Sequence, residues 1–252
     1  MSFATTIALS LALAPAAPSQ TEMVKMLRTI DERTGATSDY KAQVYIEEKE
    51  TKRKERLYEA IVYRRDQDNK LMILFVRPKS EAGKGYLRLD ANLFTYDPSV
   101  GRWERRTERE RIAGTNSRRQ DFDERRLADE FVPEFVGMEK LGDFKTVRLK
   151  LTAKKNAEVA YPVVELWIDP KSGNMLKQEE YAWSGKLLRT SYYPKWGLAK
   201  SKSGEEVYYP RETRVFDELK KGVSTTLIVR QVDLDTLPTN IFTKAWLESK
   251  SR

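Results

Sequence analysis

The chain has 252 residues, enough to bury a sizeable core in one large domain or two smaller ones. Its composition, with 40% hydrophobic and 33% charged residues and a net charge of +8, is typical of a globular protein with a heavily charged exterior. It contains no cysteine and no histidine, which excludes disulfides, thiol nucleophiles, the usual zinc sites and serine–histidine triads.

The positive charge is dispersed along the chain. The densest basic stretch, residues 102–111, holds five arginines and three glutamates, so its net charge is only +2. This pattern favours an interleaved solvent-exposed face over a phosphate-binding stripe. We therefore expect no nucleic-acid partner, and the charge to serve solubility or contact with an acidic partner.

Residues 1–20 carry no charge and contain an apolar run of about a dozen residues, Phe3–Ala14. Ala14-Pro15-Ala16 has the small-x-small form of a signal-peptidase site, so residues 1–16 are interpreted as a signal peptide although no basic residue precedes the run. The run is shorter than the roughly 20 residues that span a bilayer. An uncleaved first helix is the alternative.

Helical spacing follows, because Met23, Met26, Leu27 and Ile30 form one apolar stripe. Thr21 is the expected cap of this helix and Gly35 its end. From residue 40 onward the pattern is that of strands, and residues 17–252 are predicted to form a single domain. The expected strands, about eleven, cover residues 40–47, 57–63, 71–76, 87–89, 103–112, 147–152, 163–168, 175–183, 187–193, 208–216 and 223–232.

Two features of this strand pattern are informative. Residues 161–193 read as a three-stranded meander, with turns at Asp169–Gly173 and Ser184–Lys186. Leu71–Val76 is continuously apolar, which predicts a strand that is covered on both faces or lines a cavity. Phe242–Leu247 is expected to close the chain as a short helix or coil.

Residues 113–139 interrupt the strands. Gln120–Phe131 reads as one or two helical turns, with Phe122, Leu127 and Phe131 near one face, and Pro133 is expected to end it. This insert is interpreted either as a lid over the sheet or as a plug at one end of it.

A sheet of this length must curl, close or split into two layers. A hollow, apolar half-barrel is one outcome, and an ordinary core filled by the 12 tyrosines, nine phenylalanines and five tryptophans is the other. Glu179 and Glu180 are adjacent, so they point to opposite faces of a strand and cannot share a site. Asp121, Asp123 and Glu124 lack the spacing of a calcium loop. No catalytic residue, metal or cofactor is predicted.

Several segments resemble the outer-membrane lipoprotein-sorting proteins, relatives of the LolA and LolB periplasmic carriers. Residues 120–127, Q-D-F-D-E-R-R-L, are similar to the family segment S-D-F-[ST]-x-x-D-L. The similarity continues, in order, through Val164–Tyr181, Gly185–Thr190, Tyr209–Thr213 and Leu237–Leu247, and the matching segments span about residues 70–248.

The resemblance implies a mainly β (α+β) fold, with a single curved antiparallel sheet forming an incomplete barrel around a helical lid. It also implies a monomeric, non-enzymatic periplasmic carrier that holds lipoprotein acyl chains or another lipid, with an inner-membrane transporter and an outer-membrane acceptor as further partners. We expect the lipid-binding residues to be Phe122, Leu127, Phe131 and Phe135 in the lid, with Leu74, Leu89, Leu149 and Trp167 on the sheet. Alternation along the strands predicts that they point inward.

The chain departs from the family before the Asp121-Phe122 pair, where Asn116-Ser117-Arg118-Arg119 replace apolar, methionine-containing residues. We expect this polar approach to alter which ligand is accepted. No gating arginine can be matched by position. Two alternatives remain: a lipid- or lipoprotein-sensing or accessory module of an envelope transport complex, and an enzyme that reuses the cavity through Tyr, Glu, Lys or Arg.

Overall fold

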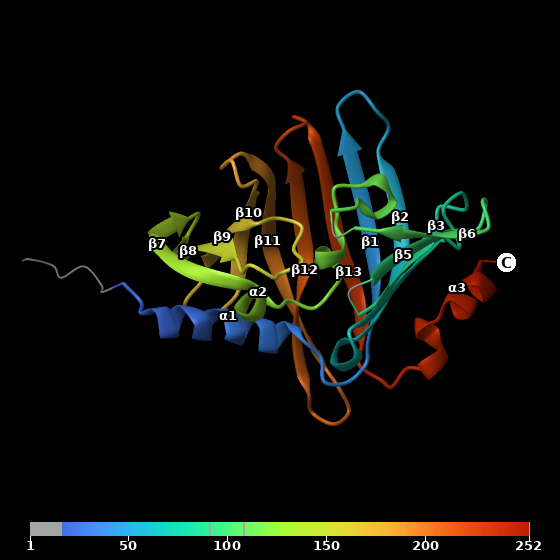
Figure 1. Cartoon of the computed structure of the whole chain (residues 1–252), viewed down its shortest axis with the longest axis horizontal. Helices are drawn as coiled ribbons and strands as arrows, with labels where there is room; N and C mark the ends of the chain where they lie inside the picture. Colours follow the sequence, from blue (N-terminus) through green and yellow to red (C-terminus); the bar gives the residue numbers. More distant parts are fainter. Residues whose placement is uncertain (1–16, 91, 108, 252) are drawn as a thin grey trace, which may run out of the picture.

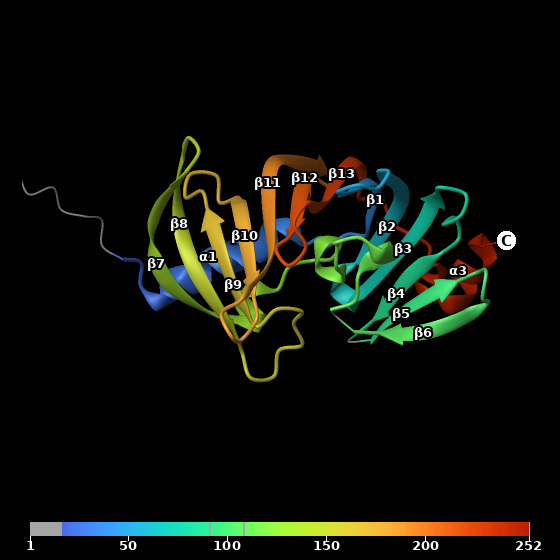
Figure 2. The same ribbon diagram turned by 90° about the horizontal axis from the view of Figure 1, so that it is seen from above.

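The computed structural model describes residues 17–90, 92–107 and 109–251. Within these ranges the chain forms one open antiparallel sheet of 13 strands, in the order β6-β5-β4-β3-β2-β1-β13-β12-β11-β10-β9-β8-β7. The sheet is strongly curved, with β6 and β7 as its two free edges (Figure 1, Figure 2). The expected signal peptide, residues 1–16, lies outside the described residues.

The strands vary from five to 14 residues in length. They are β1 Tyr40–Glu50, β2 Arg56–Arg65, β3 Lys70–Arg77, β4 Gly85–Leu89, β5 Asn92–Asp97, β6 Arg102–Arg106, β7 Phe131–Leu141, β8 Phe144–Ala153, β9 Val163–Ile168, β10 Met175–Tyr181, β11 Leu187–Lys200, β12 Glu206–Asp217 and β13 Val223–Asp233. The helices and 3-10 turns are α1 Gln20–Thr34, η1 Asp66–Asp68, η2 Ile112–Gly114, η3 Arg119–Asp121, α2 Leu127–Glu130, η4 Thr239–Phe242 and α3 Lys244–Lys250.

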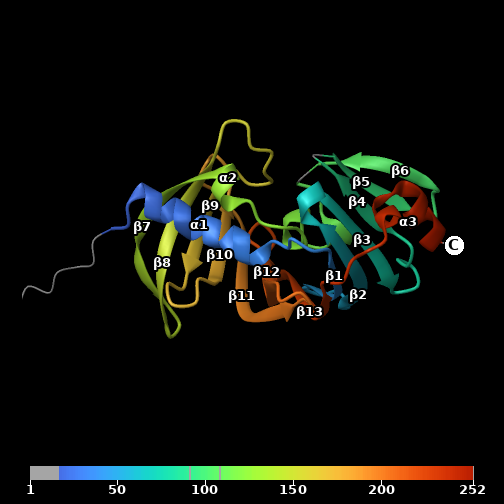
Figure 3. The same cartoon turned by 90° about the horizontal axis from the view of Figure 1, so that it is seen from below.

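The predicted first helix is confirmed as α1, which crosses one end of the strands in the β7–β12 half of the sheet (Figure 3). Its N-cap is Ser19 and not Thr21, because Ser19 and Glu22 form a reciprocal capping box at the helix start. Gly35 ends the helix as expected, in an extended conformation. None of the helices in the described part of the chain is long and apolar enough to cross a membrane.

The predicted meander is confirmed as β9, β10 and β11. Asp169 organises its first turn by accepting hydrogen bonds from the backbone nitrogens of Lys171 and Ser172 and from the Ser172 hydroxyl. Gly173 has a φ of 71°, which a residue with a side chain rarely adopts.

The expected number of strands was too low, because β5 and β7 were not predicted. Asp90, at φ 53°, turns the chain from β4 into β5 without the glycine or proline that marks most tight turns. Pro133 was expected to end the helical segment, but it lies inside β7. β7 is an edge strand, because it pairs only with β8. A proline is tolerated on such an edge strand. The expected strand at 103–112 is shorter, since β6 ends at Arg106.

Of the two possibilities predicted for Leu71–Val76, the structure shows coverage on both faces. Leu71, Ile73 and Phe75 pack into the core inside the curve. Met72 and Leu74 pack on the outer face against η4 and α3. The C-terminal helix therefore covers the outside of β3–β5 (Figure 2).

Candidate functional site

The inside of the curved sheet holds two separate apolar clusters. One is formed by strands β1–β5 and β13, together with Ile112 and Phe122. The other joins β7–β10 with α1 and α2, and includes Leu27, Leu149 and Leu166. The chain between β6 and β7 runs between these two halves of the sheet (Figure 2). Residues 109–130 of this chain, called the insert below, therefore lie where the family resemblance places a lid.

The insert is tied to the sheet by a buried ion pair on the β1–β5 side. Asp123 is fully buried and accepts a 2.9 Å hydrogen bond from Nη2 of Arg88 on β4, and it also pairs with Arg119. Burial by itself raises the pKa of Asp123, but the Arg119, Arg88 and Arg64 guanidiniums together hold it below its ordinary value of 3.8. Asp123 is therefore ionised in the folded protein at neutral pH.

A second buried ion pair holds the insert to the β9–β12 side. Nη2 of Arg189 on β11 donates to Asp121 of the insert, and its Nη1 donates to Glu180 on β10 at 2.7 Å. Glu180 is fully buried and also accepts hydrogen bonds from Gln120 and Gln178. Burial raises the pKa of Glu180, and the Arg189 guanidinium opposes that rise. Adjacent residues of a strand point to opposite faces, so Glu179 lies on the other face from Glu180. There Glu179 pairs with Lys177.

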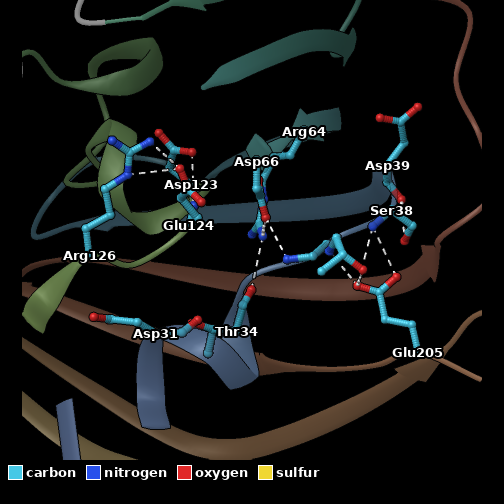
Figure 4. A network of polar contacts seen from close by, with 12 residues as sticks. Asp31, Thr34, Ser38, Asp39, Arg64, Asp66, Asp123, Glu124, Arg126 and Glu205 are labelled. Carbon is cyan, nitrogen blue, oxygen red and sulfur yellow. Dashed lines mark hydrogen bonds and ion pairs between the residues drawn. The ribbon is translucent and has the colours of Figure 1, made fainter. Parts of the chain in front are cut away.

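A polar seam joins α1 to the insert and to β2 (Figure 4). Asp31 on α1 accepts hydrogen bonds from the backbone nitrogens of Leu127 and Ala128, at 2.9 and 2.8 Å, and so caps the start of α2. Burial raises the pKa of Asp31 to about 6 despite these hydrogen bonds. At the other end of the seam, Arg64 donates to Asp66 at 2.9 Å and to the Thr34 carbonyl at 3.0 Å.

The insert therefore differs from the expected helical lid. It contains two 3-10 turns and the four-residue α2, and charged groups fasten it to the sheet. Phe122 packs in the β1–β5 cluster, whereas Leu127 packs in the β7–β10 cluster. Phe122 and Leu127 do not share one helical face, because the chain between them does not form a continuous helix.

A pocket of about 450 Å³ opens between the insert and the ends of the β10–β11 and β12–β13 hairpins. We call it the hairpin pocket. Its apolar wall consists of Ala160, Tyr161, Pro162, Ala182, Trp183, Leu188 and Leu219. Trp183 is 69% exposed and Leu219 is 54% exposed, so large apolar side chains stand in solvent at this site. Its polar wall consists of Ser184, Asp217, Asn116, Arg109, Arg111, Arg118 and Arg189.

Charges at the pocket are only partly compensated. Arg111 donates to Asp217 at 2.6 Å, and Arg109 donates to the Ala160 carbonyl at 3.1 Å. Burial raises the pKa of Asp217, but hydrogen bonds and the charge of Arg111 bring it below its ordinary value. Four arginines and one aspartate line the pocket, so it favours an anionic ligand over a cationic one.

The eight expected lipid-binding residues do not share one wall. Leu127, Phe131, Phe135 and Leu149 come together in the β7–β10 cluster, where Phe131 and Phe135 belong to β7 and not to a lid. Leu74 and Leu89 lie on the outer face, beneath the C-terminal helix. Trp167 is buried on the outer face of β9, between Arg148 and Lys177. Leu74, Leu89 and Trp167 therefore point outward and not inward as expected. The residues next to them in each strand are the ones that point inward.

None of the eight residues lines the hairpin pocket, so the sequence reasoning missed that site. One signal for it was present. Asn116 and Arg118, two of the four polar residues that depart from the family pattern, both line the pocket. Arg189 carried no such signal, because its partner Asp121 lies 68 residues away in the sequence.

A protein-family model described as "uncharacterized protein"-like matches residues 67–249. A LolA superfamily protein from Nitrosomonas europaea has 25% identity and a TM-score of 0.74, covering 88% of this chain and 97% of that one. A putative outer membrane lipoprotein-sorting protein domain from Vibrio parahaemolyticus has 18% identity and a TM-score of 0.76, covering 91% and 100%. A DUF1329 family protein from Desulfovibrio piger has 17% identity and a TM-score of 0.78, covering 90% and 98%. No curated protein matches the chain significantly.

Proposed function

The chain belongs to the LolA superfamily and to the family whose model it matches, and from this premise we propose that it is a non-enzymatic carrier of acyl chains. The carrier works in the periplasm, reached through a signal peptide at residues 1–16. It passes a lipid or a lipoprotein acyl chain toward the outer membrane, from an inner-membrane donor to an outer-membrane acceptor.

The observation that carries this proposal is the hairpin pocket with its exposed apolar wall. Trp183 and Leu219 stand in solvent at the ends of two hairpins, where an acyl chain would cover them. The volume of about 450 Å³ lies within the range of small-molecule sites. If a methylene occupies about as much room as a water molecule, roughly 30 Å³, the pocket accommodates one chain of about 15 carbons.

The energetics of binding follow from burial alone. Each methylene moved from water into the pocket stabilises the complex by about 0.8 kcal/mol, so a chain of this length binds without any covalent step. Further room for a second chain would require movement of the insert away from the sheet. That movement breaks the Arg88–Asp123 and Arg189–Asp121 ion pairs, so we expect it to need a membrane or a partner protein.

The test has two parts. Protein purified from the periplasm is examined by native mass spectrometry and organic extraction, and a fluorescent fatty acid is then titrated into delipidated protein. We expect a bound lipid or acylated peptide, and saturable binding that weakens at least tenfold in the double variant Trp183→Ala/Leu219→Ser. Leu57→Ser is the matched control, because Leu57 is 66% exposed on β2 and does not line the pocket.

A lipid-free mass together with no uptake of the fatty acid would contradict the carrier role. That result would favour the sensing or accessory module of an envelope transport complex. Equal binding by the double variant and the wild type would instead move the acyl site away from the hairpin pocket.

A further inference from the structure

Three residues that line the hairpin pocket each carry a buried hydrogen-bond donor with no partner among the described residues. These donors are Nδ2 of Asn116, Nε of Arg118 and Nε of Arg189. Asn116 and Arg189 are each 3% exposed, so their side chains are almost fully withdrawn from bulk water. Buried donors normally have a hydrogen-bond partner, so three unpartnered donors on residues that line one pocket indicate a position for an acceptor.

The residues that carry these donors all line the pocket and are held in place by the surrounding structure. Oδ2 of Asp121 accepts from the backbone nitrogen of Arg118 at 2.7 Å and from Nη2 of Arg189, so both arginines are fixed by one carboxylate. The backbone nitrogen of Asn116 donates to Oγ1 of Thr225 on β13 at 3.0 Å. The backbones of Asn116 and Arg118 and the terminal nitrogens of Arg189 are therefore fixed, and all three residues line the pocket.

The charges favour an anionic acceptor. The two terminal nitrogens of Arg189 already pair with Glu180 and Asp121, which leaves only its Nε available. Within the described part of the chain no carboxylate pairs with Arg118, whose Nη1 makes only a 3.4 Å contact with the Ser117 carbonyl. Arg118 thus has no carboxylate ion pair within the described residues, and it lines the same pocket as the residues of the two further donors. Charge-assisted hydrogen bonds from such a group are the strong ones.

We propose that Asn116, Arg118 and Arg189 bind the carboxylate of a long-chain fatty acid whose tail lies along the apolar wall of the hairpin pocket. This inference rests on the proposed function and narrows its ligand to a single-chain anion. The acyl chains of a lipoprotein end in esters and amides and present no carboxylate. A fatty acid has a charged head and one apolar tail, which match the polar and the apolar wall of the pocket.

The test compares palmitate, methyl palmitate and inorganic phosphate as competitors of a fluorescent fatty acid at pH 8. For the wild type we expect palmitate to compete at least tenfold better than the methyl ester, and phosphate at the same concentration not to compete. Arg118→Gln should weaken palmitate at least tenfold and leave the ester unchanged. Arg102→Gln is the control, because it removes the same charge from an exposed position on β6 outside the pocket.

The outcomes separate this inference from the proposed function. Equal competition by palmitate and its ester in the wild type would overturn carboxylate recognition and leave acyl binding intact. Competition by inorganic phosphate would overturn the assignment to fatty acids. Absence of any binding would overturn both. If circular dichroism shows that Arg118→Gln is unfolded, Asn116→Ser removes a donor with less change in charge, and a threefold or greater loss for palmitate alone supports the inference.

Discussion

The buried carboxylate of Asp123 offers a direct test of how the insert is held. The variant Asp123→Asn keeps the shape of the side chain but removes the charge that faces Arg88 and Arg119. The side chain of Arg88 is 4% exposed and that of Asp123 is fully buried, so water cannot replace the lost partner. Breaking a buried ion pair by removing one partner costs about 3–5 kcal/mol. With an m-value of about 3 kcal/mol/M, the urea midpoint should fall by about 1–2 M.

The pH dependence gives a second, independent measurement on the same variant. The pKa of Asp123 is lowered in the folded protein, so its contribution to stability is present above its ordinary value of 3.8 and is lost as the pH falls below it. The difference in unfolding free energy between wild type and Asp123→Asn should therefore be largest at neutral pH and shrink below about pH 4.

Urea unfolding followed by tryptophan fluorescence at several pH values measures both effects. Asp235→Asn is the control, since it removes a carboxylate that pairs with Lys202 at the surface, and we expect an unchanged midpoint. An Asp123→Asn midpoint equal to that of the wild type, or a difference that does not vary with pH, would refute the assigned role of this ion pair.

Three further predictions test other parts of the fold. Leu149→Ala should lower the unfolding free energy by about 2–5 kcal/mol, because Leu149 is fully buried, whereas Val132→Ala on the exposed face of β7 should change it little. Gly85→Ala places a Cβ 2.6 Å from the Ile73 carbonyl oxygen and 2.8 Å from Leu247, so its melting temperature should fall by roughly 3–10 °C. Gly137→Ala, whose Cβ meets nothing within 4 Å, should melt within a degree or so of the wild type. The pKa of Asp31 is raised to about 6, so the protonated side chain contributes to stability. This contribution is fully present below the ordinary pKa of 3.8 and is lost as the pH rises through 6. Urea midpoints at pH 4 to 7 should show this loss, at most about 3 kcal/mol, in the wild type and not in Asp31→Asn.

Local signals determined much of the fold. The apolar stripe of α1, the alternation in β1 and β8, and the Asp169–Gly173 turn each depend on residues close in the chain, and periodicity and turn chemistry are local properties. The unbroken apolar run of β3 predicted a strand that is covered on both faces or lines a cavity, and the first of these holds. The resemblance to lipoprotein-sorting proteins added the curvature and the position of the insert.

Only the tertiary structure decided where the charged residues lie. Asp121, Asp123, Glu180 and Arg189 read as surface residues in sequence, yet they are largely withdrawn from solvent because each meets a partner on a distant strand or on the insert. Ion pairs between distant segments leave no periodic trace in the sequence. For the same reason the hairpin pocket, which is built from the insert, the loop before β9 and two hairpin ends, was decided by how the sheet curves.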